Sequence, residues 1–238
     1  ASFVRARYPD TDIRILDAQA LDIGIQTTVK EIMDYDPDVL GFSLYTSKLN
    51  LSLMVLDSLS KSQNGKKPLI IAGGPHATFY GKNLLETRPD FDIAIVGEGE
   101  ETICDIVSAM NNDLPFETVK GLIIRKGDEI FRTERRQQIA NLDNLHLPAW
   151  DLLPALKKYY RLSGFKVKKN ASGMSIITSR GCPGKCNFCN PRGLGPGIRH
   201  HSADYIMKMI ADLYTNYGIR ELYIQDDMFN ADREHVAK

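Results

Sequence analysis

Short runs of apolar and β-branched residues alternate along the chain with longer stretches in which apolar positions recur at helical spacing. This pattern is typical of βαβ units on a parallel sheet. In the first half we expect strands at 12–18, 39–47, 69–76 and 91–101, and helices at 27–35, 50–63, about 80–88 and 101–111. Four buried strands with covering helices predict a Rossmann-like, doubly wound α/β domain.

The pattern changes in the second half of the chain. We expect a hairpin at 121–133, an ordered linker at 141–160, a strand at 174–179, a helix at 202–217 and a strand at 221–227. The last three elements form one β-α-β unit, in which the first strand leads into a cysteine-rich loop. We therefore predict three parts, at 1–115, 116–170 and 171–238.

Composition narrows the class of protein. The chain has 238 residues with 43% hydrophobic content, so it can bury a core. Its 30 basic and 30 acidic residues cancel, which argues against a nucleic-acid or membrane partner, and we expect the basic stretch Arg132–Arg136 to be solvated surface. It has no apolar run of membrane-spanning length and no signal-peptide pattern. Four cysteines are too few for a disulfide scaffold, so we expect a reducing, cytoplasmic location.

Small residues follow three of the predicted strands. The sequence reads Ser-Leu-Tyr-Thr at 43–46, Gly-Gly-Pro-His at 73–76 and Gly-Glu-Gly-Glu at 97–100. Residues without bulky side chains let a large ligand approach the backbone closely, although any one of these glycines also suits an ordinary tight turn. No G-x-G-x-x-G or Walker A motif follows a strand, so a dinucleotide or nucleoside triphosphate is poorly supported.

Cys182, Cys186 and Cys189 lie within eight residues of one another. A disulfide knot, a zinc site and an iron-sulfur site are the possible explanations. Structural zinc usually takes four protein ligands, and neither Cys104 far upstream nor the His200–His201 pair is an obvious fourth. Three thiolates on one loop suit three irons of a [4Fe-4S] cluster, which leaves the fourth iron open.

Three other residues support this loop in the sequence. Gly181 and Gly184 would let the chain wrap around a cluster, and Phe188 would shield one face of it from water. Cys104 is expected to be a small buried apolar residue rather than a ligand.

A strand followed by Cys-x3-Cys-x2-Cys, with an aromatic residue before the last cysteine, resembles the radical S-adenosylmethionine (SAM) enzymes. The resemblance implies that the open iron binds SAM and that the reduced cluster cleaves it to a 5′-deoxyadenosyl radical. It also implies an external electron donor such as flavodoxin or ferredoxin. Asp226 and Asp227, at the end of the next strand, would hold SAM; capping of the following helix is the alternative.

The upstream half resembles the cobalamin (B12)-binding domain that precedes the radical core in the B12-dependent radical SAM subclass. The matching features are GFSLYTS, IAGGPHAT and VGEGEE in that order, then the hairpin and the linker LHLPAWDLLP. By that resemblance the residues in contact with cobalamin would be Ser43, Leu44, Tyr45, Thr46, Gly73, Gly74, Glu98, Gly99 and Glu100.

Two departures from the family pattern are visible. The Asp-x-His-x-x-Gly loop, whose His ligates cobalt in other cobalamin domains, is absent from the sequence, and the strand that would precede it lies before residue 1. His76 follows the Gly-Gly strand end rather than such a loop, so we do not expect it to ligate cobalt. The residues after Cys189 suffice for only the first β-α-β portion of a radical SAM (β/α)6 partial barrel. We therefore expect an N-terminal fragment with a truncated core that is inactive by itself.

The resemblance implies methyl transfer to an unactivated carbon or oxidative cyclisation, on a small-molecule substrate of unknown identity. Two alternatives remain open: a radical SAM enzyme whose first domain is a docking module without cobalamin, and, for this chain alone, a non-catalytic cofactor-binding module. A methylthiotransferase is disfavoured because that family places further cluster cysteines upstream, where only Cys104 occurs.

Overall fold

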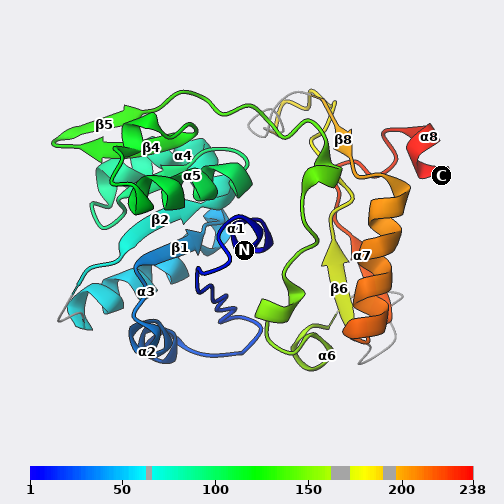
Figure 1. Cartoon of the computed structure of the whole chain (residues 1–238), viewed down its shortest axis with the longest axis horizontal. Coiled ribbons are helices and arrows are strands. Elements are labelled where there is room, and N and C mark those ends of the chain that lie inside the picture. The colour runs from blue at the N-terminus through cyan, green and yellow to red at the C-terminus, as the bar shows by residue number, and fades with distance from the viewer. Residues whose placement is uncertain (63–65, 162–171, 190–196, 238) are drawn as a thin grey trace. The chain divides into compact units, whose positions relative to one another are not determined.

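A five-stranded sheet in the order β1-β2-β3-β4-β5 lies at the centre of residues 23–138 (Figure 1). Its strands are β1 (Val39–Ser43), β2 (Leu69–Gly73), β3 (Ile93–Ile95), β4 (Leu122–Lys126) and β5 (Glu129–Arg132). The first three are parallel, with Ser43 opposite Gly73, whereas β4 runs antiparallel to β3 and β5 antiparallel to β4. The computed structural model describes residues 1–62, 66–161, 172–189 and 197–237.

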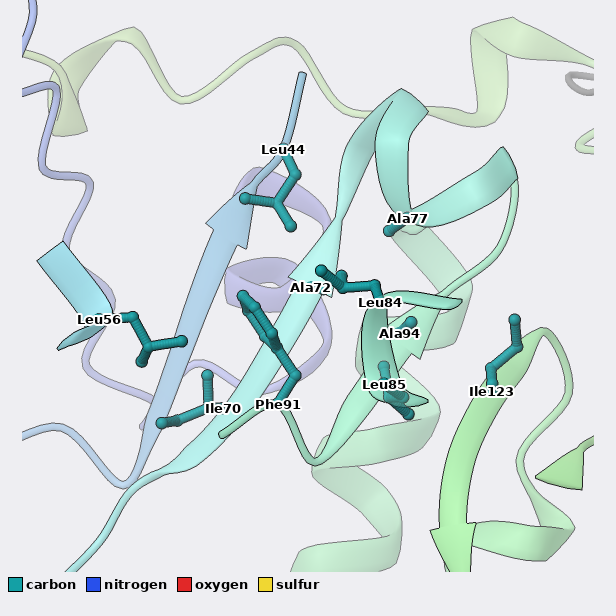
Figure 2. Close-up of a cluster of buried hydrophobic side chains, with 10 residues drawn as sticks. All are labelled: Leu44, Leu56, Ile70, Ala72, Ala77, Leu84, Leu85, Phe91, Ala94 and Ile123. Atoms are coloured by element: carbon teal, nitrogen blue, oxygen red, sulfur yellow. The ribbon is translucent and has the colours of Figure 1, made fainter. Parts of the chain in front are cut away.

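Helices cover both faces of this sheet. On one face lie α3 (Leu49–Ser62) and α4 (Gly74–Thr87), and on the other lies α5 (Glu100–Asn111). Helix α2 (Ile25–Tyr35) packs against α3, and short 3-10 turns occur at η1 (Thr46–Lys48) and η2 (Phe116–Thr118). Alternate side chains of β2 serve the two faces, as a pleated strand requires. Ile70 and Ala72 lie in a cluster with Leu56 of α3 and Leu85 of α4 (Figure 2), whereas Ile71 lies in a second cluster with residues of α5. The Rossmann-like α/β fold predicted from the sequence is therefore confirmed.

The sequence pattern and the structure differ in two places. The predicted hairpin at 121–133 forms, but as β4 and β5 it completes the main sheet instead of standing apart in a linker. The predicted strand at 12–18 is wrong, because these described residues form no strand. Apolar alternation is present there, but this segment belongs to the other unit of the chain and does not extend the sheet at β1.

Arg136, after β5, is not the solvated surface residue that the sequence predicts. Its side chain is only 13% exposed, and its guanidinium donates to Thr102 Oγ1 at 2.8 Å, to the Glu101 carboxylate at 3.1 Å and to Asp105. All three acceptors lie in the first turns of α5. This group of charge-assisted bonds fastens the segment after the hairpin to the helix.

The second unit combines residues 1–22 with residues 139–238. Strand β6 (Gly173–Ile176) pairs in parallel with β9 (Glu221–Ile224), and the two-residue strands β7 (Ser179–Arg180) and β8 (Arg199–His200) pair antiparallel. The helices of this unit are α1 (Ser2–Arg7), η3 (Leu142–Asn144), η4 (Trp150–Leu152), α6 (Leu156–Tyr159), α7 (Ala203–Asn216) and α8 (Arg233–Val236).

Helix α7 covers the β6–β9 pair. Met209 and Leu213 of α7 lie in one buried cluster with Ile176 of β6 and Trp150. The predicted β-α-β unit is thus present, and the rest of a partial barrel stays a prediction, as does the functional division at 1–115, 116–170 and 171–238. Among the residues that the structure describes, none of the helices has the length and apolar character that crossing a bilayer requires.

Two leucines of α3 test the assignment of the core. Leu56 is completely buried and Leu51 is 60% exposed. We expect Leu56→Ala to lower the free energy of unfolding by about 2–5 kcal/mol, because it leaves a cavity beside β2. Leu51→Ala, in the same helix, is the control and should change it by no more than about 0.5 kcal/mol. Equal effects in urea unfolding would contradict this packing.

Candidate cofactor sites

The first candidate site is the edge of the main sheet where β1, β2 and β3 end. Parallel strands bring their carboxyl ends to one edge, and ligands of such sheets bind there. The Leu44 N–H donates to Gly73 O at 2.8 Å, and the His76 N–H donates to Leu44 O at 3.0 Å. These two bonds connect the loop after β1 to the end of β2 and to the first turn of α4. They therefore fix the position of the loop relative to the helix.

Side chains add to this connection. Thr46 Oγ1 lies 3.0 Å from His76 Nδ1, and the ring of Tyr80 lies 5.2 Å from the His76 ring. His76 is 8% exposed, and its burial lowers the pKa of the imidazole, which favours the neutral form at neutral pH. One ring nitrogen of His76 is therefore engaged with Thr46 in a buried position.

Thr78 connects the loop after β3 to the same edge of the sheet. Its hydroxyl donates to Gly74 O at 3.1 Å and accepts the Gly97 N–H at 3.1 Å. A threonine often bonds the carbonyl four residues earlier in a helix, so the first contact has a sequence signal. The second joins residues far apart in the sequence, which is why the pattern of the chain did not single out Thr78.

Most of the predicted cobalamin residues line this edge. Ser43, Tyr45 and Thr46 are exposed, while the residues of intermediate exposure are Gly73, Gly74, Glu98, Gly99 and Glu100. Leu44 differs, because its side chain is completely buried in the core (Figure 2) and its N–H and C=O are both bonded. In this structure Leu44 shapes the edge through its backbone.

Gly74 is the tightest point of the edge. Its φ is +85°, and a Cβ there would lie 2.9 Å from Leu44 O. Only glycine fits without strain. Helix α4 begins here after Gly73 with no acidic residue in its first turn, so the positive end of its dipole faces this edge. Helix α5 begins after Gly99, but Glu100 and Glu101 in its first turn offset its dipole. A backbone cradle of small residues with this polarity suits an extended, partly anionic ligand such as the nucleotide tail of cobalamin.

The second candidate site is the loop that holds the three cysteines. Its described ends are paired as β7 and β8, and Gly181 lies at the entrance with a φ of +94°. A Cβ on Gly181 would overlap Gly197 O, so the two ends of the loop touch through backbone atoms. The loop is thereby closed at its base.

The three cysteines carry free thiols. Cys182 is partly buried, and Cys186 and Cys189 are exposed. The Gly184 N–H donates to Cys182 Sγ at 3.4 Å, and a Cβ on Gly184 would lie 3.2 Å from Cys182 Sγ and 3.8 Å from Cys186 Sγ. Two sulfurs therefore lie beside the same glycine, as the sequence predicts for a wrapping loop. Among the residues that the structure describes, no group of three metal-ligating side chains lies close enough together to hold one metal ion. In number and chemistry the thiols fit a cluster with one open iron.

The Phe188 side chain is 94% exposed. Its predicted shielding of a bound cluster stays a prediction. Asn187 and Phe188 form a turn closed by the Cys189 N–H, which donates to Cys186 O at 3.2 Å. Both central residues of this turn are exposed.

Asp226 follows β9 and contacts the strand end that leads into the cysteine loop. Its Oδ1 accepts the Thr178 N–H at 2.7 Å and the Ser179 N–H at 3.1 Å, and its Oδ2 accepts the Thr178 hydroxyl. Asp227 is exposed. The alternative of helix capping does not describe either residue, because α8 begins at Arg233 and the Asp232 side chain accepts the Glu234 N–H there.

His201 closes the other side of this region. Its backbone N–H donates to Thr178 O at 2.9 Å. In the side chain, Nδ1 lies 3.3 Å from Asp143 Oδ1, and the ring stacks on the Tyr205 ring with 4.0 Å between their centroids. Burial lowers the pKa of His201 although Asp143 raises it. The imidazole thus has Nδ1 beside Asp143 and one face against Tyr205.

Comparison with known proteins bears on the family of the chain. The model of the B12 binding domain family matches residues 1–107. The predicted resemblance to radical SAM proteins with a B12-binding domain is confirmed by this match together with the relatives that follow.

The relatives are longer than this chain. An uncharacterized methyltransferase of Pyrococcus horikoshii is 30% identical over 237 residues, which is 99% of this chain and 49% of the relative. The anaerobic magnesium-protoporphyrin IX monomethyl ester cyclase of Synechocystis sp. is 27% identical over 222 residues, 91% of this chain and 42% of the relative. The structure of the cobalamin-dependent SAM radical enzyme OxsB shares the fold, with a TM-score of 0.78 at 21% identity over 95% of this chain and 30% of that one. The chain thus spans about half or less of each.

Gly74 tests the geometry of the sheet edge. We expect Gly74→Ala to lower the free energy of unfolding by at least about 1–2 kcal/mol, because a left-handed backbone is costly for alanine and its Cβ would meet Leu44 O. Gly41→Ala is the control, since a Cβ at Gly41 in β1 meets nothing within 4 Å. Chemical unfolding of both variants measures the difference, and a neutral Gly74→Ala would contradict the described cradle.

His76 predicts a pH dependence of stability. Burial lowers the pKa of His76 in the folded state, whereas in the unfolded state the imidazole has its ordinary pKa of 6.5. Below that pH the unfolded state binds more protons, so stability falls as the pH drops toward the folded pKa. We expect His76→Asn, which cannot titrate, to lose less unfolding free energy than the wild type between about pH 7.5 and about pH 5.5. Identical losses would show that His76 is not the source.

Proposed function

We propose that the protein containing this chain is a cobalamin-dependent radical SAM enzyme, which transfers a methyl group to an unactivated carbon or closes a ring oxidatively. The observation that carries the proposal is a closed loop with three free cysteines in a chain whose residues 1–107 match the B12 binding domain. The names of the relatives, a methyltransferase and a cyclase, support both reactions.

Each set of residues has a role in this proposal. Cys182, Cys186 and Cys189 would hold three irons of a [4Fe-4S] cluster, and the Gly184 N–H would donate to a ligating sulfur, which tunes its potential. Asp227 would contact SAM, and Asp226 lies next to it after β9, where it binds Thr178 and Ser179. The bound groups would supply a reductant that cleaves SAM to a 5′-deoxyadenosyl radical and a carrier for the methyl group.

The sheet edge would bind cobalamin. Exposed Tyr45 and Thr46 would contact the corrin or its tail, and the glycines would let the tail pass close to the backbone. The residues assigned to this edge are Ser43, Leu44, Tyr45, Thr46, Gly73, Gly74, Glu98, Gly99 and Glu100. We further propose a cytoplasmic protein with a small-molecule substrate and with flavodoxin or ferredoxin as its electron donor.

Anaerobic reconstitution of the complete protein with iron, sulfide and hydroxocobalamin tests this function. After desalting, we expect about four irons and one corrinoid per chain, and formation of 5′-deoxyadenosine when a reductant and SAM are added. Four irons without corrinoid would refute the cobalamin assignment and favour a docking role for the first domain. Absence of iron would refute the radical SAM assignment.

The cysteine ligands can be tested one at a time. We expect Cys182→Ala, Cys186→Ala and Cys189→Ala each to lose most of the iron and the visible absorption of the cluster, because each removes one of three thiolates. Cys104→Ala is the matched control, since Cys104 is completely buried in α5, and it should retain wild-type iron. Loss of iron from Cys104→Ala alone, with the other three unchanged, would overturn the ligand assignment.

A further inference from the structure

Asp226 binds the chain immediately before the cysteine loop. Three hydrogen bonds reach its carboxylate, from the Thr178 N–H, the Ser179 N–H and the Thr178 hydroxyl. Thr178 is 1% exposed and Ser179 is 3% exposed, so in the folded chain their backbone groups have little access to water and depend on this acceptor. The carboxylate is therefore the acceptor on which two buried donors of the strand end depend.

The same strand end is held from other directions. Thr178 O accepts the His201 N–H at 2.9 Å, and Ser179 and Arg180 pair with His200 and Arg199. The Gln225 N–H, just before Asp226, donates to Ile176 O at 2.8 Å, which extends the parallel pairing of β6 and β9. Asp226 thus fixes the direction of the chain after β6 relative to the end of β9.

This position is close to the first cysteine. Cys182 is three residues after Ser179, and the intervening Gly181 already lies against Gly197. A change in direction at 178–179 would therefore move Cys182 and the base of the loop together. The cluster ligands themselves make few contacts, since Cys186 and Cys189 are exposed.

The acceptor capacity of Asp226 is largely used by these bonds. Each carboxylate oxygen offers about two lone-pair sites, and Oδ1 already accepts two N–H groups. A SAM ammonium group would have to share the remaining capacity of Oδ2, which also accepts from Thr178. Most acceptor sites of this carboxylate are therefore used by groups of the protein chain.

We propose that Asp226 is a positioning residue that orients the cysteine loop for cluster assembly, acting through Thr178 and Ser179. The inference rests on the proposed iron-sulfur cluster and assigns to Asp226 a role distinct from direct contact with SAM, which falls to Asp227. Its hydrogen-bond geometry, rather than its charge, is what the loop requires.

Four variants of the complete protein test this role: Asp226→Ala, Asp226→Asn, Asp227→Ala and Thr178→Val. The readouts are iron content after anaerobic reconstitution, the rate of iron loss to a chelator, and the electron paramagnetic resonance spectrum of the reduced cluster with and without SAM. We expect Asp226→Ala to lose iron about tenfold to a hundredfold faster, as is typical when a residue that orients metal ligands is removed.

The conservative variant separates positioning from charge. Asp226→Asn should hold iron as the wild type does, because its amide oxygen can accept both N–H groups and its amide nitrogen can donate to the Thr178 hydroxyl. Asp227→Ala should also hold iron but show a weaker spectral change on adding SAM. Thr178→Val keeps the backbone donors and removes one bond, so it should show a smaller acceleration of iron loss.

Other outcomes would overturn the inference. Asp226→Ala and Asp226→Asn with normal iron but no spectral response to SAM would make Asp226 a direct SAM contact. Wild-type iron retention in Asp226→Ala with a normal response would leave it no role. If Asp226→Ala fails to fold, as judged by circular dichroism, faster iron loss from Thr178→Val supports the inference and unchanged loss refutes it. A wild-type protein that binds no iron would instead refute the proposed function.

Discussion

The parallel pairing of β1 and β2 is the constraint on which the sheet edge depends. With Ser43 opposite Gly73, the next amide, that of Leu44, donates back to Gly73, and the carbonyl of Leu44 receives the first turn of α4 through His76. Because buried backbone groups must be paired, these bonds determine the path of the chain around Gly74. The buried Thr46–His76 contact and the Thr78 hydroxyl then connect the remaining loops to that path.

The cysteine loop obeys a related constraint by different means. Its exposed ligands have little packing of their own, so the order of the loop comes from its base, where β7 pairs with β8 and Gly181 meets Gly197. Polar contacts from Asp226 and His201 hold the chain just before it. In both sites the groups that would touch a cofactor are supported by buried residues that would not touch it.

Local patterns explain what the sequence predicts well. The helices and most strands follow apolar periodicity, and the cysteine ligands follow a spacing contained in one loop. The strand predicted at 12–18 has the alternation but gains no place in the sheet, since pairing depends on distant chain segments. Phe188 is exposed because it lies in a turn closed by one backbone hydrogen bond, and the residue types do not predict that turn.

Long-range polar contacts account for the rest of what the sequence missed. Nothing near Arg136 in the sequence signals that it reaches α5, and nothing near Asp226 signals that it binds residues 178–179. Leu44 was assigned from its place in a motif, but its side chain serves the core. Residue type and spacing locate the candidate sites, whereas the identity of their supporting residues follows from the tertiary structure.

The hairpin and Arg136 have a consequence for where this protein can be divided. A piece ended at residue 115 would contain all three parallel strands and would still lack β4, which covers the free side of β3. The unpaired groups of β3 would then be exposed at a sheet edge, which is a template for association with other chains. The acidic first turns of α5 would also lose the cation that neutralises them. The smallest part of the chain that keeps β3 paired and keeps Arg136 bound to α5 therefore extends past residue 136, although every strand end at the proposed cobalamin site lies before residue 101.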